Sequence, residues 1–497
     1  MTASAPARRP ALMARRPALF VRLRAAGRAD LAVLGFCALG AGNVWAWQGT
    51  GNVNVAANPP AFIVGFGVIA LAAIFCYMAI GRPASLPGAA LCTVAIAAQT
   101  CLEPTYLLPI PEVFAVGLIF AVVPLVRSSR VAWLLIAAAS AATAIALASV
   151  WKWGSVGIDV FDEVQGSTAA LLHGRNPYSP VFSVFLGTHH GQAILGSGSF
   201  AYGPMVVLLS LPSRLLGDVR LTVIGLNVAI LAAVLVWARR ASGDHRLAPT
   251  ITALLAASPF VPFMVLFEWT DSFCVAGFAW WLVLRERHRA WATAALTFGI
   301  ASKPSILLLM VPLLFWTGEA RRELVWAAAA ALVIVAPFAL WTGVPQFVYD
   351  TVGVFGDLPT RQDGVTLDGL ATMLGQGFFP GTLLICGIIV TLVVFTLRRP
   401  RDYGSLLAAG SGLLIVVCFF GKQAFLNYYF IAAIGLLFTL GSGSMAPRDQ
   451  IASPLNRVSR ALQRCVAAVG GGSAIARGAH PAARDDAPAA SGAKRNV

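Results

Sequence analysis

Hydrophobic and polar stretches alternate along this chain at a spacing typical of membrane helices. Apolar runs of spanning length, or close to it, recur with short polar interruptions between them. They lie at about 31–48, 61–80, 86–102, 112–126, 131–150, 221–238, 249–266, 270–284, 291–302, 304–317, 324–343, 380–397, 404–420 and 424–441. This pattern predicts an all-α polytopic membrane protein with about 14 spans.

The longest polar interval between these runs extends from Gly157 to Pro204. On a helical wheel, one arc collects the less polar residues Val160, Phe161, Val164, Thr168, Leu171 and Leu172. The opposite arc holds Asp159, Asp162 and Glu163. We therefore predict a helix in the membrane interface, with its acids toward water, that ends at Gly174 before Asn176-Pro177. The three acids either form the solvated face of this helix or belong to a catalytic site.

The same pattern divides the chain into five parts. The predicted parts are a basic cytoplasmic tail (1–30), about five transmembrane helices (31–150), an external loop with the interfacial helix (151–203), a transmembrane core (204–441) and a disordered cytoplasmic tail (442–497). Within the core, residues 344–379 form a second long external loop. We expect both long loops to carry short interfacial helices.

Composition and charge placement agree with a membrane protein and argue against nucleic-acid binding. Of the 497 residues, 58% are hydrophobic and 11% are charged, whereas a soluble domain has about a quarter charged. The net charge is +15, but the arginines lie in short loops and tails between apolar runs. With a cytoplasmic N-terminus, one set of loops holds 14 basic residues and the other only 6, namely Lys152, Arg175, Arg220, Lys303, Arg361 and Lys422. This bias places the 157–203 loop outside.

Two segments decide on which side the later loops lie. Tyr202–Leu216 is apolar but short and contains Pro204 and Pro212. If it is re-entrant or interfacial, as we favour, the basic loops and the C-terminal tail stay cytoplasmic. The runs 291–302 and 304–317 meet at Lys303-Pro304, which is either a tight external turn or a kink in one long helix.

Few ionisable residues remain near the predicted outer ends of the spans. They are Asp159, Asp162, Glu163, Arg175, Glu268, Asp271, Lys303, Arg361 and Lys422. Carboxylates can deprotonate a hydroxyl, and lysine or arginine can hold a phosphate. Individually, Lys303 can be a snorkelling residue, Glu268 and Asp271 helix N-terminal charges, and Lys422 a turn residue. The occurrence of acidic and basic residues together on one face favours a catalytic or binding site. The cysteines and histidines show no metal-binding spacing, so no metal is expected.

At these residues the chain resembles the polytopic GT-C glycosyltransferases, and most closely family GT87 (the DUF2029 group). The matching pieces are Asp159 followed by LLHGRNPYSP (171–180), FAYGP (200–204), EWTDS (268–272), GIASKP (299–304) and GKQAFLNYYF (421–430). They cover roughly 150–440 of the chain. The resemblance implies a GT-C-type helix bundle in a bacterial inner membrane, and the charge bias described above places both termini in the cytoplasm.

The resemblance also implies an activity and its residues. A sugar is transferred from a polyprenyl-phosphate donor to a glycan or glycolipid acceptor at the outer face, without a dissociable cofactor. The family's loop aspartate maps onto Asp159 as general base, with Asp162 and Glu163 as alternatives. The matched motifs and loops supply the candidates for binding substrate and phosphate, namely Arg175, Asn176, Tyr178, Tyr202, Glu268, Asp271, Lys303, Arg361, Lys422, Asn427 and Tyr428.

The chain departs from the family pattern in two places. About four extra spans precede the acidic loop, and Trp269–Asp271 stands where the family often has Gln-Asn or Gln-Asp. Two other functions are compatible with the composition: a transporter or flippase for lipid-linked sugars, and an acyl- or phosphotransferase acting on lipids. A transporter tends to show internal repeats and charges at mid-span, and neither is evident here.

Overall fold

The computed structural model describes most of the chain between Ala26 and Met445. The described residues are 26–50, 58–102, 110–151, 159–189, 192–242, 246–358, 361, 363–376, 381–398, 400, 402–443 and 445. The chain divides into two compact units, 1–452 and 453–497, and all described residues belong to the first. The predicted tails 1–30 and 442–497 therefore lie almost wholly outside the described residues.

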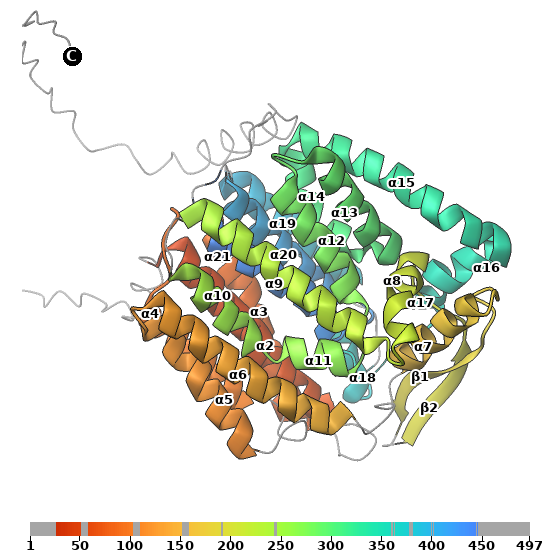
Figure 1. Ribbon diagram of the computed structural model, residues 1–497, viewed down its shortest axis with the longest axis horizontal. Helices are drawn as coiled ribbons and strands as arrows, with labels where there is room; N and C mark the ends of the chain where they lie inside the picture. The colour runs from red at the N-terminus through yellow and green to blue at the C-terminus, as the bar shows by residue number, and fades with distance from the viewer. Residues whose placement is uncertain are drawn as a thin grey trace, which may run out of the picture. The chain divides into compact units, whose positions relative to one another are not determined.

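The first helices form one side of the bundle. They are α2 (Arg28–Thr50), α3 (Pro59–Ala79), α4 (Ala89–Leu102), α5 (Ile110–Val122), the short 3₁₀ turn η1 (Val123–Leu125) and α6 (Ser129–Trp151). The start of α3 follows from its sequence, because the Asn58 side chain accepts the backbone N–H of Ala61 and two prolines open the helix. Helix α2 packs against α3 and α21 (Leu426–Gly441), whereas α4–α6 lie at the side of the bundle opposite α7 (Asp159–Leu172) (Figure 1).

The acidic loop contains the predicted helix and, in addition, a hairpin. Helix α7 ends as predicted, because Gly174 adopts φ +68° and the N–H groups of Gly174 and Arg175 bond back to carbonyls of the last turn. Strands β1 (Phe182–His189) and β2 (Gln192–Gly198) then pair antiparallel, in a register that joins Phe182 to Gly198. The hairpin was not predicted, and it covers one flank of α7 (Figure 1).

The remaining helices build the core and the wall of the site. They are α8 (Pro204–Leu215), α9 (Arg220–Ser242), α10 (Leu247–Ala256), α11 (Phe260–Leu266), α12 (Asp271–Leu284), α13 (Arg289–Ser302), the 3₁₀ turn η2 (Pro304–Ile306), α14 (Leu307–Trp316) and α15 (Gly318–Thr342). After α15 come α16 (Val344–Val348), the π-helical turn η3 (Tyr349–Gly353), α17 (Val354–Asp357), α18 (Leu367–Met373), α19 (Gly381–Arg398), α20 (Tyr403–Phe420) and α21. The most buried of these are α12, α20 and α21, which form the centre of the core.

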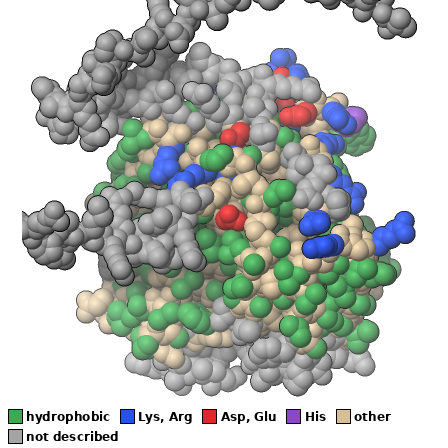
Figure 2. Space-filling view, turned by 90° about the vertical axis from the view of Figure 1, so that its left-hand side faces the viewer, with side chains coloured by type: hydrophobic (Ala, Val, Ile, Leu, Met, Phe, Trp, Pro, Cys, Tyr) green, Lys and Arg blue, Asp and Glu red, His purple; other side chains and the backbone are tan. Residues whose placement is uncertain are grey.

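Six helices in the described part of the chain are long and apolar enough to cross a membrane, and up to eight spans result if each bent pair counts as one. The six are α2, α3, α9, α15, α19 and α20. The predicted membrane protein is confirmed at this level, but the predicted count of about 14 is not. Figure 2 shows one face on which hydrophobic side chains cover the lower part while charged side chains gather higher up.

Most of the difference in the span count comes from five predicted runs whose described apolar helices have only 10–17 residues, namely Ala89–Thr100, Ala115–Leu125, Ser129–Ile145, Asp271–Leu284 and Leu426–Gly441. Two breaks add to the difference. The run 249–266 divides at Ser258-Pro259 into α10 and α11, which meet at 51°. At Lys303-Pro304 the chain turns by 119° between α13 and α14, so this junction is a tight turn rather than a kink. Helix α8 has 12 residues, or about 18 Å, which is shorter than the roughly 30 Å hydrocarbon core.

Candidate active site

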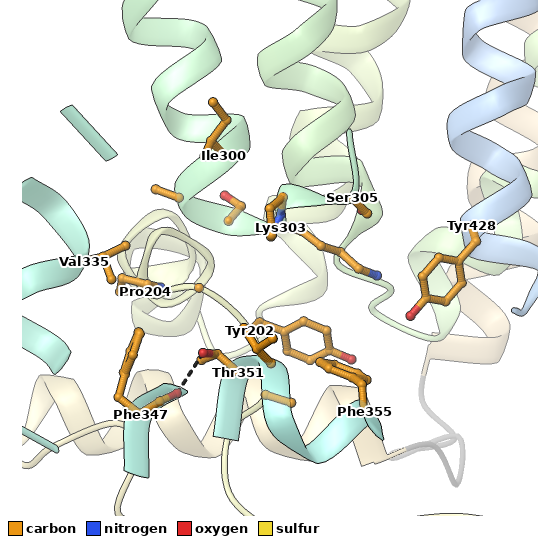
Figure 3. Close-up of a pocket in the computed structure, with 16 residues that line it drawn as sticks. Tyr202, Pro204, Ile300, Lys303, Ser305, Val335, Phe347, Thr351, Phe355 and Tyr428 are labelled. Atoms are coloured by element: carbon orange, nitrogen blue, oxygen red, sulfur yellow. Dashed lines mark hydrogen bonds between the residues drawn. The ribbon is translucent and has the colours of Figure 1, made fainter. Parts of the chain in front are cut away.

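A cavity of about 450 Å³ lies where α8, the α13–α14 turn, α15 and the α16–α17 segment meet (Figure 3). Its wall is mostly apolar and is formed by Ala201, Tyr202, Gly203, Pro204, Ile300, Ala301, Ser302, Lys303, Pro304, Ser305, Val335, Phe347, Thr351, Val352, Phe355 and Tyr428. The only charged residue among them is Lys303. The cavity can therefore receive an apolar group with a polar end near Lys303.

Lys303 is held by a carboxylate and an amide from two other helices. Its Nζ lies 2.9 Å from Oδ1 and 3.0 Å from Oδ2 of Asp271, the first residue of α12. The side chain of Asp271 is fully buried, and its Oδ2 also accepts the Nδ2–H of Asn427 on α21 at 2.5 Å. Three predicted site residues, distant in sequence, are thus brought into one polar cluster.

Two tyrosines surround the ammonium group of Lys303. Its Nζ lies 4.3 Å from the ring centroid of Tyr428 and 5.8 Å from that of Tyr202. Figure 3 shows the Lys303 side chain extending between these two rings. Cation–π contacts of this kind stabilise a charge that has left water. The predicted aromatics Tyr202 and Tyr428 therefore belong to the same cluster as Lys303.

The Ala201–Gly203 segment, which carries Tyr202, is fixed by its backbone. The hydroxyl of Tyr178 donates to the carbonyl of Tyr202 at 2.8 Å, and the N–H of Gly203 donates to the carbonyl of Ser302 at 3.0 Å. A Cβ at Gly203 would lie 2.0 Å from the carbonyl oxygen of Ala301, so only glycine fits there. Tyr178 is itself buried and supports the cavity wall without lining it.

The acids of α7 lie behind this segment. Asp159 and Glu163 are one helical turn apart, and the phenol of Tyr202 lies within electrostatic range of both. Asp162 is exposed on the outer side of α7. The prediction that all three acids share the polar arc is wrong for Glu163, which is 4% exposed. It faces inward with Val160 and Val164 because residues three and four apart share a helix face.

Burial changes the acid–base behaviour of this region. It raises the pKa of Glu163 well above its usual range, and the negative charge of Asp159 adds to the effect. Burial likewise raises the pKa of Tyr202, followed by the charges of Glu163 and Asp159. A buried carboxyl group beside a negative charge favours its neutral form.

The other two predicted phosphate ligands lie on the loops beside the cavity. Arg361 forms an ion pair with Asp363 at 2.6 Å and lies over the ring of Phe425. Lys422 donates from Nζ to the backbone carbonyl of Gly356 at 2.7 Å, next to the cavity residue Phe355. Within the described part of the chain, Lys422 is not paired with a carboxylate. Its charge is therefore the most available of the three.

The remaining predicted residues lie away from the cavity wall. Arg175 is exposed, and the Nδ2 of Asn176 contacts the hydroxyl of Thr342 at 3.1 Å. Glu268 is fully buried near Asp218 and Arg220, and it is the one described non-glycine residue with a positive φ, +54°. Such strain persists only where the surrounding packing imposes it.

Sequence reasoning missed one wall of the cavity. Phe347, Thr351, Val352 and Phe355 come from the second long loop, where α16, η3 and α17 run along the cavity (Figure 3). A π-helical turn widens the backbone at Thr351 and Val352, and such turns are frequent at functional sites. No signal in the sequence identifies this turn. Among the described residues, no three His, Cys, Asp or Glu side chains gather closely enough to hold a metal ion.

Comparison with known proteins gives a match to one protein family. Neither a curated protein nor a solved structure matches the chain. The family model of glycosyltransferase family 87 matches residues 200–427, a range that contains every residue lining the cavity except Tyr428, together with Asp271 and Asn427. With its membrane-spanning helices, this match supports a membrane glycosyltransferase. The family predicted from the sequence is thus confirmed over residues 200–427, which carry the glycosyltransferase family 87 pattern.

Proposed function

We propose that this protein transfers a sugar from a polyprenyl-phosphate donor to a hydroxyl group of a glycan or glycolipid, with inversion at the anomeric carbon. The observation that carries the proposal is the position of Tyr202. It lines the cavity inside the family match, and it has the α7 acids on one side and Lys303 on the other. A candidate base behind Tyr202 and a set of cations thus lie around one apolar cavity.

The donor's two parts match the two kinds of surface in and around the cavity. The apolar wall from Pro204, Val335 and Phe347 suits the first part of an isoprenoid chain. The phosphate would lie toward Lys422, because this is the one of the three cations that has no carboxylate partner among the described residues. Arg361, whose ion pair with Asp363 is partly exposed, can add its charge, whereas Lys303 is held by the fully buried Asp271. The exposed apolar surface of α15 gives lipid a route to this wall from the membrane.

In this mechanism Asp159 acts as general base. It takes the proton of the acceptor hydroxyl while that oxygen forms a bond to the anomeric carbon. The bond between the anomeric carbon and the phosphate oxygen breaks, and the electron pair leaves on the polyprenyl phosphate. Lys422 and Arg361 stabilise the charge that develops there. Attack opposite the leaving group inverts the anomeric configuration.

The test uses purified full-length protein in lipid nanodiscs with a panel of polyprenyl-phosphate sugars and membrane acceptors. Wild type should consume a donor and give an inverted product, and Asp159→Asn should lower the rate about a hundredfold or more. Asp162→Asn is the matched control on the exposed side of the same helix. A large loss in Asp162→Asn alone would move the base to Asp162. Binding or translocation of the lipid without donor cleavage would favour the transporter.

A further inference from the structure

Glu163 contacts the backbone of the segment that carries Tyr202. Its carboxyl group accepts a hydrogen bond from the backbone N–H of Ala201, at the start of the segment that carries Tyr202. The second oxygen, Oε2, is buried and has no hydrogen-bond partner among the described residues. An oxygen that water cannot reach is unable to take a proton directly from an acceptor hydroxyl.

The contact with Ala201 completes a set of three on one short segment. Tyr178 holds the carbonyl of Tyr202, and Ser302 holds the N–H of Gly203. The three contacts come from α7, from the loop that follows α7 and from the end of α13. Together they fix the main chain of Ala201–Gly203 and thus the direction of the Tyr202 ring between the α7 acids and Lys303.

The groups that face Glu163 favour a neutral carboxyl there. Asp159 lies one turn earlier on α7, and Tyr202 lies on the segment packed against it. Of the other elements packed on α7, α8 has Arg214 as its one charged residue, in its last turn. Arg220 of α9 lies over the ring of Phe161 on α7, 4.8 Å from its centroid, and forms an ion pair with Asp218. No cation is positioned to balance a second negative charge beside Asp159 in the described residues that contact Glu163.

We propose that Glu163 is a positioning residue, which holds the Ala201–Gly203 main chain through its carboxyl group and leaves the negative charge of the pair on Asp159. This inference rests on the proposed function, since it assigns Glu163 a role in setting up the base. It also separates two acids of one helix: Asp159 reacts, and Glu163 acts through Asp159 and Tyr202.

The sign of the pH effect follows from the raised pKa of Glu163. The folded protein holds the Glu163 proton in a pH range where the unfolded chain has lost it. Stability should therefore fall as pH rises from about 4.3 toward the folded-state value. The Ala201 N–H favours the ionised form of Glu163, but burial and the negative charge of Asp159 oppose it more strongly. Above the folded-state value, repulsion between the two carboxylates should therefore displace the Glu163 side chain and the segment that it holds, and kcat/KM should fall.

The experiment compares wild type, Glu163→Gln, Glu163→Ala and Asp159→Asn as full-length protein in nanodiscs between pH 5 and 9. Glutamine keeps the shape and an oxygen that accepts the Ala201 N–H, but it cannot ionise. Glu163→Ala should lower kcat/KM about tenfold, consistent with losing one hydrogen bond and its positioning effect. Glu163→Gln should restore most of that loss and should remove the fall at high pH.

Thermal unfolding of the same samples gives a readout that needs no activity. The midpoint of wild type relative to Glu163→Gln should decrease as pH rises. The proposal would be overturned if the midpoint of wild type relative to Glu163→Gln increased with pH, or if the two proteins had equal pH profiles in both assays. A loss of kcat/KM in Glu163→Gln as large as that in Asp159→Asn would also overturn it. If no donor is consumed by any form, the proposed function fails, while the unfolding profiles still decide the protonation state of Glu163.

Discussion

Lys303 and Asp271 form a buried ion pair that joins the α13–α14 turn to the start of α12, with 2.9 Å between Nζ and Oδ1. Their side chains are 11% and 0% exposed, so neither charge is solvated by bulk water. Removing one partner of such a pair leaves an uncompensated charge. The pair therefore links the shape of the cavity to the stability of the core.

We expect Asp271→Asn to lower the free energy of unfolding by about 3 kcal/mol, because it leaves the Lys303 ammonium without its carboxylate. The double variant Lys303→Met with Asp271→Leu should be more stable than Asp271→Asn, since it removes both charges. Titration with SDS in mixed micelles, followed by tryptophan fluorescence, measures the differences. Equal stability of Asp271→Asn and wild type would show that Lys303 and Asp271 do not form the ion pair in the folded protein.

Lys422 should contribute to donor binding and little to folding. Among the described residues its one polar contact is the carbonyl of Gly356, so its ammonium is available to a phosphate. We expect Lys422→Ala to raise the KM for the lipid donor about tenfold, as one charge-assisted hydrogen bond is lost. Steady-state kinetics with varied donor concentration measures this. Arg289→Ala is the control, because Arg289 is 66% exposed in a surface ion pair, and an equal effect there would point to nonspecific attraction of anionic lipid.

Substitutions on α15 test whether the lipid donor binds in the cavity. Val335 lines it, whereas Val333 on the same helix is 74% exposed and faces outward. Val335→Trp should fill the space and reduce donor binding at least tenfold, whereas Val333→Trp should leave it unchanged. Equilibrium binding of a fluorescent polyprenyl phosphate to nanodiscs distinguishes the two. Equal binding by both variants would place the lipid elsewhere.

Local features of the fold could be predicted from the sequence, and contacts between distant segments could not. The helix at 159–172 and its end at Gly174 follow from periodicity and from one glycine. The turn at Lys303-Pro304 was one of two alternatives, and the 119° bend decides between them. The span count failed because an apolar run does not fix helix length or direction, as the break at Pro259 illustrates.

The site was predictable as a list of residues and not as an arrangement. Charge in an apolar chain marked Asp271 and Lys303, which meet, and Glu268, which lies apart near Arg220. The burial of Glu163 depends on the segment at Ala201, about forty residues away in sequence, so a helical wheel cannot detect it. Whether Asp159 is the base stays a prediction.

Gly203 offers a test of the backbone that carries Tyr202. A methyl group there would lie 2.0 Å from the carbonyl oxygen of Ala301, which cannot move without shifting α13. Gly203→Ala should therefore lower the free energy of unfolding by roughly 2 kcal/mol and reduce activity. Gly225→Ala in α9 is the control, since nothing lies within 4 Å of its Cβ position. That control should be slightly more stable than wild type, because alanine is the better helix former. A Gly203→Ala variant as stable as wild type would show that the segment is loosely held.

Glu268 should give a pH-dependent stability of its own. Burial raises the pKa of this carboxyl group, the negative charge of Asp218 adds to the effect, and Arg220 opposes it. Both carboxyl oxygens lack a hydrogen-bond partner among the described residues. The folded chain thus keeps a proton that the unfolded chain loses above about pH 4.3, so ionisation favours unfolding as pH rises.

Glu268→Gln removes this ionisation and keeps the shape of the side chain. Relative to wild type, its thermal midpoint should be similar near pH 4 and progressively higher as pH rises toward 8, in a series measured in one detergent. Glu319→Gln is the control at a surface ion pair and should show no such trend. A midpoint advantage of Glu268→Gln that shrinks as pH rises would mean that the folded protein stabilises the Glu268 carboxylate, with Arg220 as the dominant neighbour.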